Sequence, residues 1–85
     1  MAVLTKQDLE RMLQQLPLRE FSVSVEGRPG HLVAEVCSPE FRAQDEAVRQ
    51  QTAWEFLVET LTDEQRDEVE FVFTVTPEET RKAAA

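Results

Sequence analysis

Two short segments in which apolar and polar side chains alternate flank the turn sequence at residues 27–30, and this feature most limits how the chain can fold. A period of two over residues 21–26 and 32–37 is typical of strands with one buried face. We therefore predict an antiparallel hairpin. If the turn closes symmetrically, every apolar residue faces an apolar partner on the same side: Phe21 faces Val36, Val23 faces Ala34 and Val25 faces Leu32.

Helices are predicted on both sides of this hairpin. Thr5 is a suitable N-cap for an amphipathic helix that ends before Pro17. A longer helix is expected from about Asp45 to Thr60, and residues 62–65 form a capping box for a short third helix. The apolar residues of the longer helix widen toward its C-terminal half, so we expect the core to surround that half, with Trp54 inside: Val48, Ala53, Trp54, Phe56, Leu57, Val58 and Leu61.

The last strand is predicted over residues 69–75 and ends before Pro77. Simple alternation places Val69, Phe71, Phe73 and Val75 on its inner face. We expect one domain over residues 1–85, with an ordered core from about 4 to 77 and a frayed tail over 78–85.

The predicted fold class is α+β, in the order α-β-β-α-(α)-β. A crossover through the long helix makes the second and third strands parallel, which gives a three-stranded mixed sheet with the helices on one face. The other face can remain in contact with water, because its expected residues are mostly polar: Ser22, Ser24, Glu26, Val33, Glu35, Cys37, Glu70, Val72 and Thr74.

The charge of the chain argues against several kinds of partner. The chain has 9 Lys and Arg against 17 Asp and Glu, a formal net charge of −8. Binding to nucleic acid or to an anionic membrane needs clustered basic residues, and here they are scattered. A single Cys excludes an internal disulfide framework and a Cys-rich zinc site. With no signal-peptide pattern and no run of 18 apolar residues, we expect a cytoplasmic protein.

His31 and Cys37 are the only available base and nucleophile of the classical Cys-His type. On one strand their Cα atoms would lie roughly 20 Å apart, too far for a catalytic hydrogen bond or for a shared metal ion. We therefore predict no enzyme, no catalytic residue and no metal site. The expected roles are structural, with His31 as the cross-strand partner of Glu26 and Cys37 as a small apolar residue.

The carboxylates offer the best candidates for partner binding. The densest run is either a solvated surface or a docking patch for a basic partner, and Glu35 belongs to the exposed sheet face: the candidates are Asp63, Glu64, Asp67, Glu68, Glu70 and Glu35. Residues 27–30 also match the GxxG pattern of KH domains. In KH domains that loop joins two helices, whereas the flanking alternation here predicts a hairpin.

Residues 31–41 resemble the BolA family, in which a His, alternating apolar residues and a Ser-x-x-Phe sequence form the second strand. The spacing continues without a gap. Arg49, Trp54 and Leu57 fall on the family's helix Arg, Tyr and Leu, and residues 76–79 match its Thr-Pro-x-Glu. The resemblance covers roughly residues 5–80 and implies a KH-like fold.

BolA proteins assist iron–sulfur cluster handling with monothiol glutaredoxins, and some bind DNA. The family's ligand His corresponds here to Glu68 or Glu70, and residues 27–30 hold neither Cys nor His. Carboxylates suit such clusters poorly. We therefore expect a non-enzymatic interaction module or adaptor without a cofactor, monomeric or homodimeric, with a protein partner such as a glutaredoxin. The alternatives are a cluster shared through His31, a KH-like nucleic-acid-binding regulator, and a small structural protein.

Overall fold

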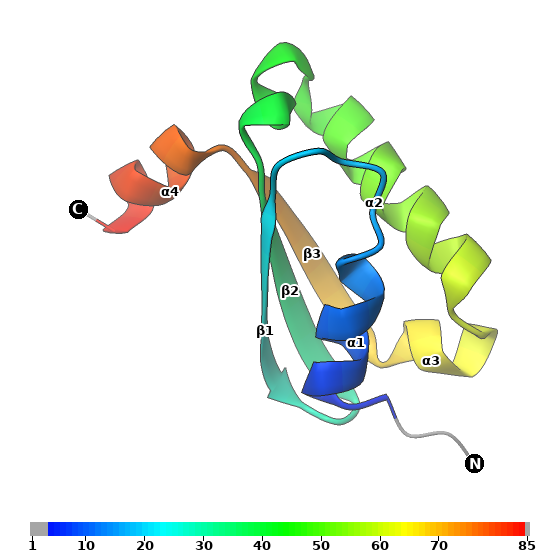
Figure 1. Ribbon diagram of the computed structural model, residues 1–85. Helices are drawn as coiled ribbons and strands as arrows, with labels where there is room; N and C mark the ends of the chain where they lie inside the picture. The colour runs from blue at the N-terminus through cyan, green and yellow to red at the C-terminus, as the bar shows by residue number, and fades with distance from the viewer. Residues whose placement is uncertain (1–3, 85) are drawn as a thin grey trace.

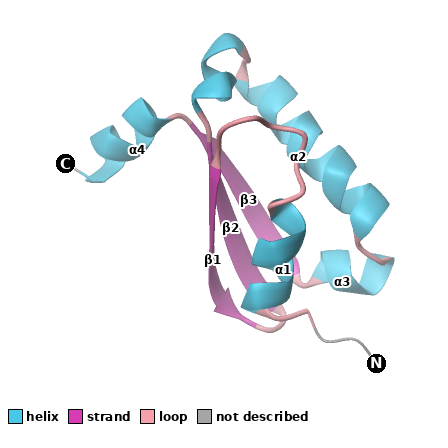
Figure 2. Cartoon of the chain, in the orientation of Figure 1, coloured by secondary structure: helices cyan, strands magenta, loops and turns pink. Residues whose placement is uncertain are grey.

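The computed structural model describes residues 4–84 and confirms the α+β class (Figure 1). A three-stranded sheet, in the order β1-β2-β3, carries helices α1, α2 and α3 on one side, while α4 extends from the end of the sheet (Figures 1 and 2). Of the helices formed by these residues, none has the length and apolar character needed to span a bilayer.

The predicted helix starts are confirmed. Thr5 and Asp8 form a capping box for α1 (Lys6–Leu13), and Thr62 forms another with Gln65 for α3 (Asp63–Asp67). The Asp45 side chain caps α2 (Glu46–Thr60) by accepting from the amide of Val48. Each cap satisfies amides that the first helical turn leaves without partners, which explains why these helices begin where they do.

The hairpin is confirmed, but its register differs from the prediction by two residues. Strands β1 (Ser22–Arg28) and β2 (His31–Cys37) are antiparallel, and Val36 faces Val23 rather than Phe21. The connection is tighter than a symmetric four-residue turn. Pro29 and Gly30 form it, and the φ of Gly30 is 90°, which matches a type II turn. A shift of two residues keeps every side chain on its predicted face.

The hairpin end also corrects the predicted partner of His31. The register places Arg28 opposite His31 and Glu26 opposite Val33, so His31 and Glu26 do not pair across the strands. Gly27 sits beside this end with a φ of 102°, and a Cβ atom there would lie 2.1 Å from the carbonyl oxygen of His31. Only glycine fits such a close approach.

Strand β3 (Val69–Val75) is parallel to β2, as predicted, but its inner face is different. The register jumps from Leu32 opposite Val69 to Val33 opposite Phe71, so one residue of β3 is left over. Such an irregularity moves every later side chain of the strand to the opposite face of the sheet. Val72 and Thr74 are therefore buried, whereas Phe71 and Phe73 are exposed. The predicted inward placement of both rings and of Val75, which shares their face, is wrong.

The core lies between the sheet and the helix layer. Its buried apolar residues are Leu4, Leu9, Leu13, Leu16, Leu32, Ala34, Val36, Phe41, Ala53, Leu57, Leu61, Val69 and Val72. Trp54 packs against this core but is only half-buried. Val58 is exposed, so the core covers only part of the C-terminal half of α2, and Val48 near the start of the helix is exposed as well.

The segment after β3 is a helix rather than a frayed tail. Helix α4 (Pro77–Ala84) begins with a capping box in which the Thr76 hydroxyl accepts from the amide of Glu79, and the Glu79 carboxylate accepts from the amide of Thr76. Pro77 occupies the first helical position, where its missing N–H costs nothing. Residue 85 lies outside the described residues.

Candidate functional site

The sheet face away from α1, α2 and α3 is the candidate site, and we call it the open face. Strand alternation places on it Ser22, Ser24, Glu26, Arg28, His31, Val33, Glu35, Cys37, Phe71, Phe73 and Val75. The three helices of the other layer leave it uncovered (Figure 2). Helix α4 borders it at one end, where the Thr80 hydroxyl lies 3.8 Å from the Cys37 sulfur.

Two phenyl rings dominate the open face. Phe71 is 43% exposed and Phe73 48% exposed. Their centroids lie 4.6 Å apart at an interplanar angle of 67°, an edge-to-face arrangement. Val33 faces Phe71 across the strand pair and extends the apolar surface toward β1. The face is therefore much more apolar than the sequence predicts, because Val72 and Thr74 have exchanged places with these rings.

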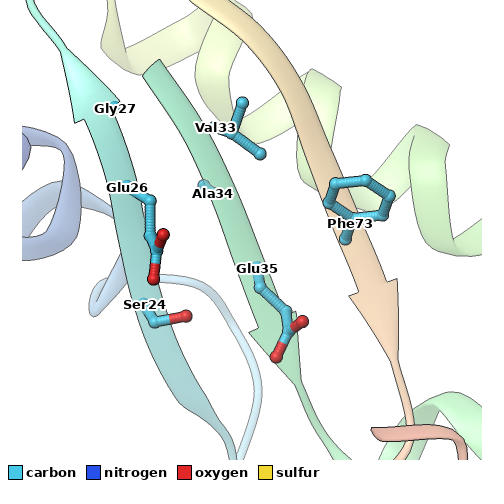
Figure 3. Close-up of a pocket in the computed structure, with 7 residues that line it drawn as sticks. All are labelled: Ser24, Glu26, Gly27, Val33, Ala34, Glu35 and Phe73. Atoms are coloured by element: carbon cyan, nitrogen blue, oxygen red, sulfur yellow. The ribbon is translucent and has the colours of Figure 1, made fainter. Parts of the chain in front are cut away.

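A shallow depression of about 340 Å³ lies beside Phe73. It is lined by Ser24, Glu26, Gly27, Val33, Ala34, Glu35 and Phe73. Figure 3 shows Ser24 and Glu26 on β1, the Phe73 ring on β3, and Glu35 on β2 between them. The depression is open to solvent along the sheet, so it suits contact with another surface better than the enclosure of a small substrate.

The candidate reactive groups stay apart. His31 begins β2 and Cys37 ends it, and the Nδ1 atom of His31 lies 2.5 Å from a carboxylate oxygen of Glu70. His31 thus has its partner on β3 rather than on β1. Among residues 4–84, no three His, Cys, Asp or Glu side chains are grouped so that they could hold a metal ion.

The predicted carboxylates fall into separate places. Asp63, Glu64 and Asp67 lie exposed on α3, where Asp63 pairs with Arg66 one turn later. The Glu68 carboxylate already has a partner within the chain, because it accepts a hydrogen bond from the amide of Leu4 at 3.2 Å. Glu70 pairs with His31, as described above. Of the six candidates, Glu35 alone lines the depression on the open face.

The outer edge of β3 is closed by side chains of α2. The Gln50 amide donates to the Val72 carbonyl at 2.8 Å and to the Thr74 hydroxyl at 3.1 Å. Arg49 reaches the Thr74 carbonyl at 3.5 Å. Because these donors occupy acceptors that an added strand would use, this edge is poorly suited to strand addition. The interaction surface that remains on β3 is its open face.

Helix α4 is held at the end of the open face by two arginines. Arg42 forms an ion pair with Glu78, and the Arg49 guanidinium donates to Glu79 at 2.9 Å. The hydrogen bond from Arg42 lowers the pKa of Glu78 from 4.5 to about 2. The pKa of Glu79 is also lowered, first by the Thr76 amide and then by Arg49.

We expect the Glu78 carboxyl to titrate far below the range of a free glutamate, and Arg42→Met to return its midpoint toward 4.5. Carbon-detected NMR of that carboxyl group would measure both values. Since its pKa is depressed in the folded state, the ion pair contributes its full stabilisation above about pH 4.5 and loses it as the pH falls through about 2. Arg81→Met is the matched control and should leave the titration unchanged. A midpoint near 4.5 in the unaltered protein would contradict the ion pair.

Comparisons with known proteins leave the family open. A scan against protein-family models, a search of curated proteins and a search of solved structures each found no match to this chain. What can be stated of the class of this protein is therefore its α+β fold with an uncovered sheet face. The BolA resemblance remains an expectation from the sequence motifs.

Proposed function

We propose that this protein is a non-enzymatic interaction module that binds a protein partner through the open face. The observation that carries this proposal is the pair Phe71 and Phe73, which are 43% and 48% exposed and whose rings are in contact with each other. Aromatic residues are enriched at the centres of protein interfaces, where they bury large area at low entropic cost. Two neighbouring exposed rings on an uncovered sheet face fit that role.

The distribution of reactive groups supports a binding role over catalysis. An enzyme needs a nucleophile or base within hydrogen-bonding reach of its partner group. The lone imidazole and the lone thiol of the chain stand at opposite ends of β2 instead. The Thr80 hydroxyl, which lies 3.8 Å from the Cys37 sulfur, is not a base that could activate it.

The charge supports a protein partner over a nucleic acid. A net charge of −8 repels phosphate, and Glu26 and Glu35 lie on the open face itself. The BolA resemblance makes a monothiol glutaredoxin the first purified partner to test. A KH-like nucleic-acid-binding role would instead give a gel shift at low salt that weakens steeply as salt is added.

The proposal predicts that Phe71→Ser/Phe73→Ser weakens partner binding while the domain remains folded. Affinity capture from the source organism would supply the partner, and calorimetry with the purified protein would measure the affinity. We expect a loss of at least about tenfold, because truncated aromatic anchors commonly cost 2 kcal/mol or more.

The matched control is Val48→Ser/Val58→Ser, which changes two exposed apolar residues on α2. This variant should bind the partner as the unaltered protein does. Urea midpoints of both variants would establish that they fold. Equal affinity of the unaltered protein and the Phe71/Phe73 variant for the captured partner would exclude the open face as the binding surface.

A further inference from the structure

Two glutamates of the open face lie on neighbouring strands, Glu26 on β1 and Glu35 on β2. Glu26 is opposite Val33, and Glu35 is opposite Ser24, so the two glutamates are diagonal neighbours on paired strands. Both line the depression beside Phe73 (Figure 3). Among the ion pairs formed by the described residues, none includes either glutamate. Like charges at this spacing repel each other, and a cation from outside the chain would relieve that repulsion.

The surroundings of the two carboxylates favour a cation carried by a protein. The Phe73 ring borders the depression and can bind a guanidinium or ammonium group by a cation–π contact. The apolar surface continues past the depression through Val33 and Phe71. A small free cation would leave that surface exposed to water, whereas a peptide segment with both basic and apolar side chains would cover it.

A second copy of this chain fits the open face poorly. A two-fold contact centred on the depression would bring Glu26 and Glu35 of one copy near those of the other. Each copy also carries a net charge of −8. Such a juxtaposition of like charges opposes association. The charge pattern therefore selects a partner with a basic surface.

We propose that the open face binds a basic and apolar segment of a protein partner, with an Arg or Lys side chain in the depression that Glu26, Glu35 and Phe73 line. This inference rests on the proposed function and adds the chemistry of the partner. The apolar side chains of the segment cover Phe71 and Val33, and the cation neutralises the carboxylate pair.

Fluorescence anisotropy with three labelled peptides tests this inference: alternating Leu-Arg, alternating Ser-Arg and alternating Leu-Glu. We expect the Leu-Arg peptide to bind best, the Ser-Arg peptide about tenfold more weakly because it lacks apolar contacts, and the Leu-Glu peptide not to bind. Glu26→Gln/Glu35→Gln should weaken binding of the Leu-Arg peptide by about tenfold and reduce its dependence on salt.

The matched control is Glu55→Gln/Glu59→Gln on α2, where two glutamates also lie beside apolar side chains, Trp54 and Val58. This variant loses the same charge and should bind the peptide within about twofold of the unaltered protein. Equal weakening in both variants would overturn the inference, because only the net charge would then matter. Binding of the Leu-Glu peptide, or a dimer that Phe71→Ser/Phe73→Ser dissociates, would also overturn it.

The two proposals fail separately. If Phe71→Ser/Phe73→Ser removes binding of the captured partner but Glu26→Gln/Glu35→Gln does not, the open face is the interaction surface and the basic segment is wrong. If neither double variant affects partner binding, both proposals fail.

Discussion

Replacing Val72 with Asp is expected to abolish cooperative folding of this domain. The Val72 side chain has 0% exposure and lies in the core. A carboxylate at this position would lose its hydration without gaining a cationic partner, which costs several kcal/mol. Small domains are stable by only about 5–15 kcal/mol, so this single change removes most of the stability. Circular dichroism during urea titration should show no folded baseline.

The matched control is the same substitution one residue later. Phe73→Asp introduces the same charge into β3, but at a side chain that is 48% exposed on the open face. We expect this variant to remain folded, with a stability change of about 1 kcal/mol or less, as for surface substitutions in general. The reverse result, a folded Val72→Asp and an unfolded Phe73→Asp, would place the rings in the core as simple alternation predicts.

Val72 and Phe73 also show where the sequence pattern predicts the wrong face of β3. Val69, Phe71, Phe73 and Val75 recur at every second position, and this period is typical of one strand face. The period holds only while the pairing with β2 is regular. The irregularity near Val69 adds one residue and moves the rings outward. Such irregularities depend on how neighbouring strands pack, and local pattern alone does not reveal them.

Other elements could be predicted because local chemistry determines them. The caps at Thr5, Asp45 and Thr62 need only side chains within a few residues, and the structure contains all three. The two faces of the hairpin were predicted correctly even though its register was wrong by two residues. Register depends on turn length, and Pro29 with Gly30 makes a shorter turn than symmetry suggests. The side chains stay on their predicted faces because a shift of two residues equals the period of a strand.

Helix α4 could also have been predicted from the sequence. Thr76 followed three residues later by Glu79, with Pro77 at the first helical position, is a capping-box signature. The polar composition after Pro77 suggested a tail instead. The sequence does not reveal that this helix is held by arginines from distant segments, since those ion pairs exist only in the folded chain.

The candidate site was predicted only in part. The sequence favoured carboxylates, and the structure leaves Glu35 on the open face while Asp63, Glu64 and Asp67 lie on α3. The sequence does not predict that Phe71 and Phe73 are exposed, because the register irregularity decides which residues of β3 face the core. Val72 was the one available sign, since an apolar residue between Phe71 and Phe73 means that both faces of the strand carry apolar side chains.

Arg49 carries a buried charge at the end of the open face. Arg49 is 7% exposed, and its guanidinium donates to carbonyl oxygens of Phe41 and Gln44, each at 3.0 Å, and to the Glu79 carboxylate at 2.9 Å. It also lies 5.8 Å from the centroid of the Phe41 ring. These contacts join the 3-10 helix η1 (Pro39–Ala43) and α2 to α4. Arg49 is therefore, with Arg42, one of the two arginines that hold α4 beside Cys37.

Arg49→Met is accordingly expected to lower the free energy of unfolding by about 3 kcal/mol. Met keeps the length of the apolar stem but donates no hydrogen bond, so the carbonyls of Gln44 and Thr74 lose their guanidinium donor. The Phe41 carbonyl keeps the amide of Gln44 as a donor. A buried acceptor left unsatisfied costs about 1–3 kcal/mol. The Glu79 carboxylate adds little to the loss, since its side chain is 49% exposed and water can solvate it. Urea denaturation would measure the change, with the slope of the transition unaltered.

Arg42→Met is the matched control, because it removes the same group from the exposed ion pair with Glu78. Exposed ion pairs contribute about 0–1 kcal/mol, so this variant should be only slightly less stable than the unaltered protein. The two variants separate a guanidinium that satisfies buried backbone from one that only pairs with a surface carboxylate. Similar losses in both would mean that the buried carbonyls find other donors, and the end of the open face would then not depend on Arg49.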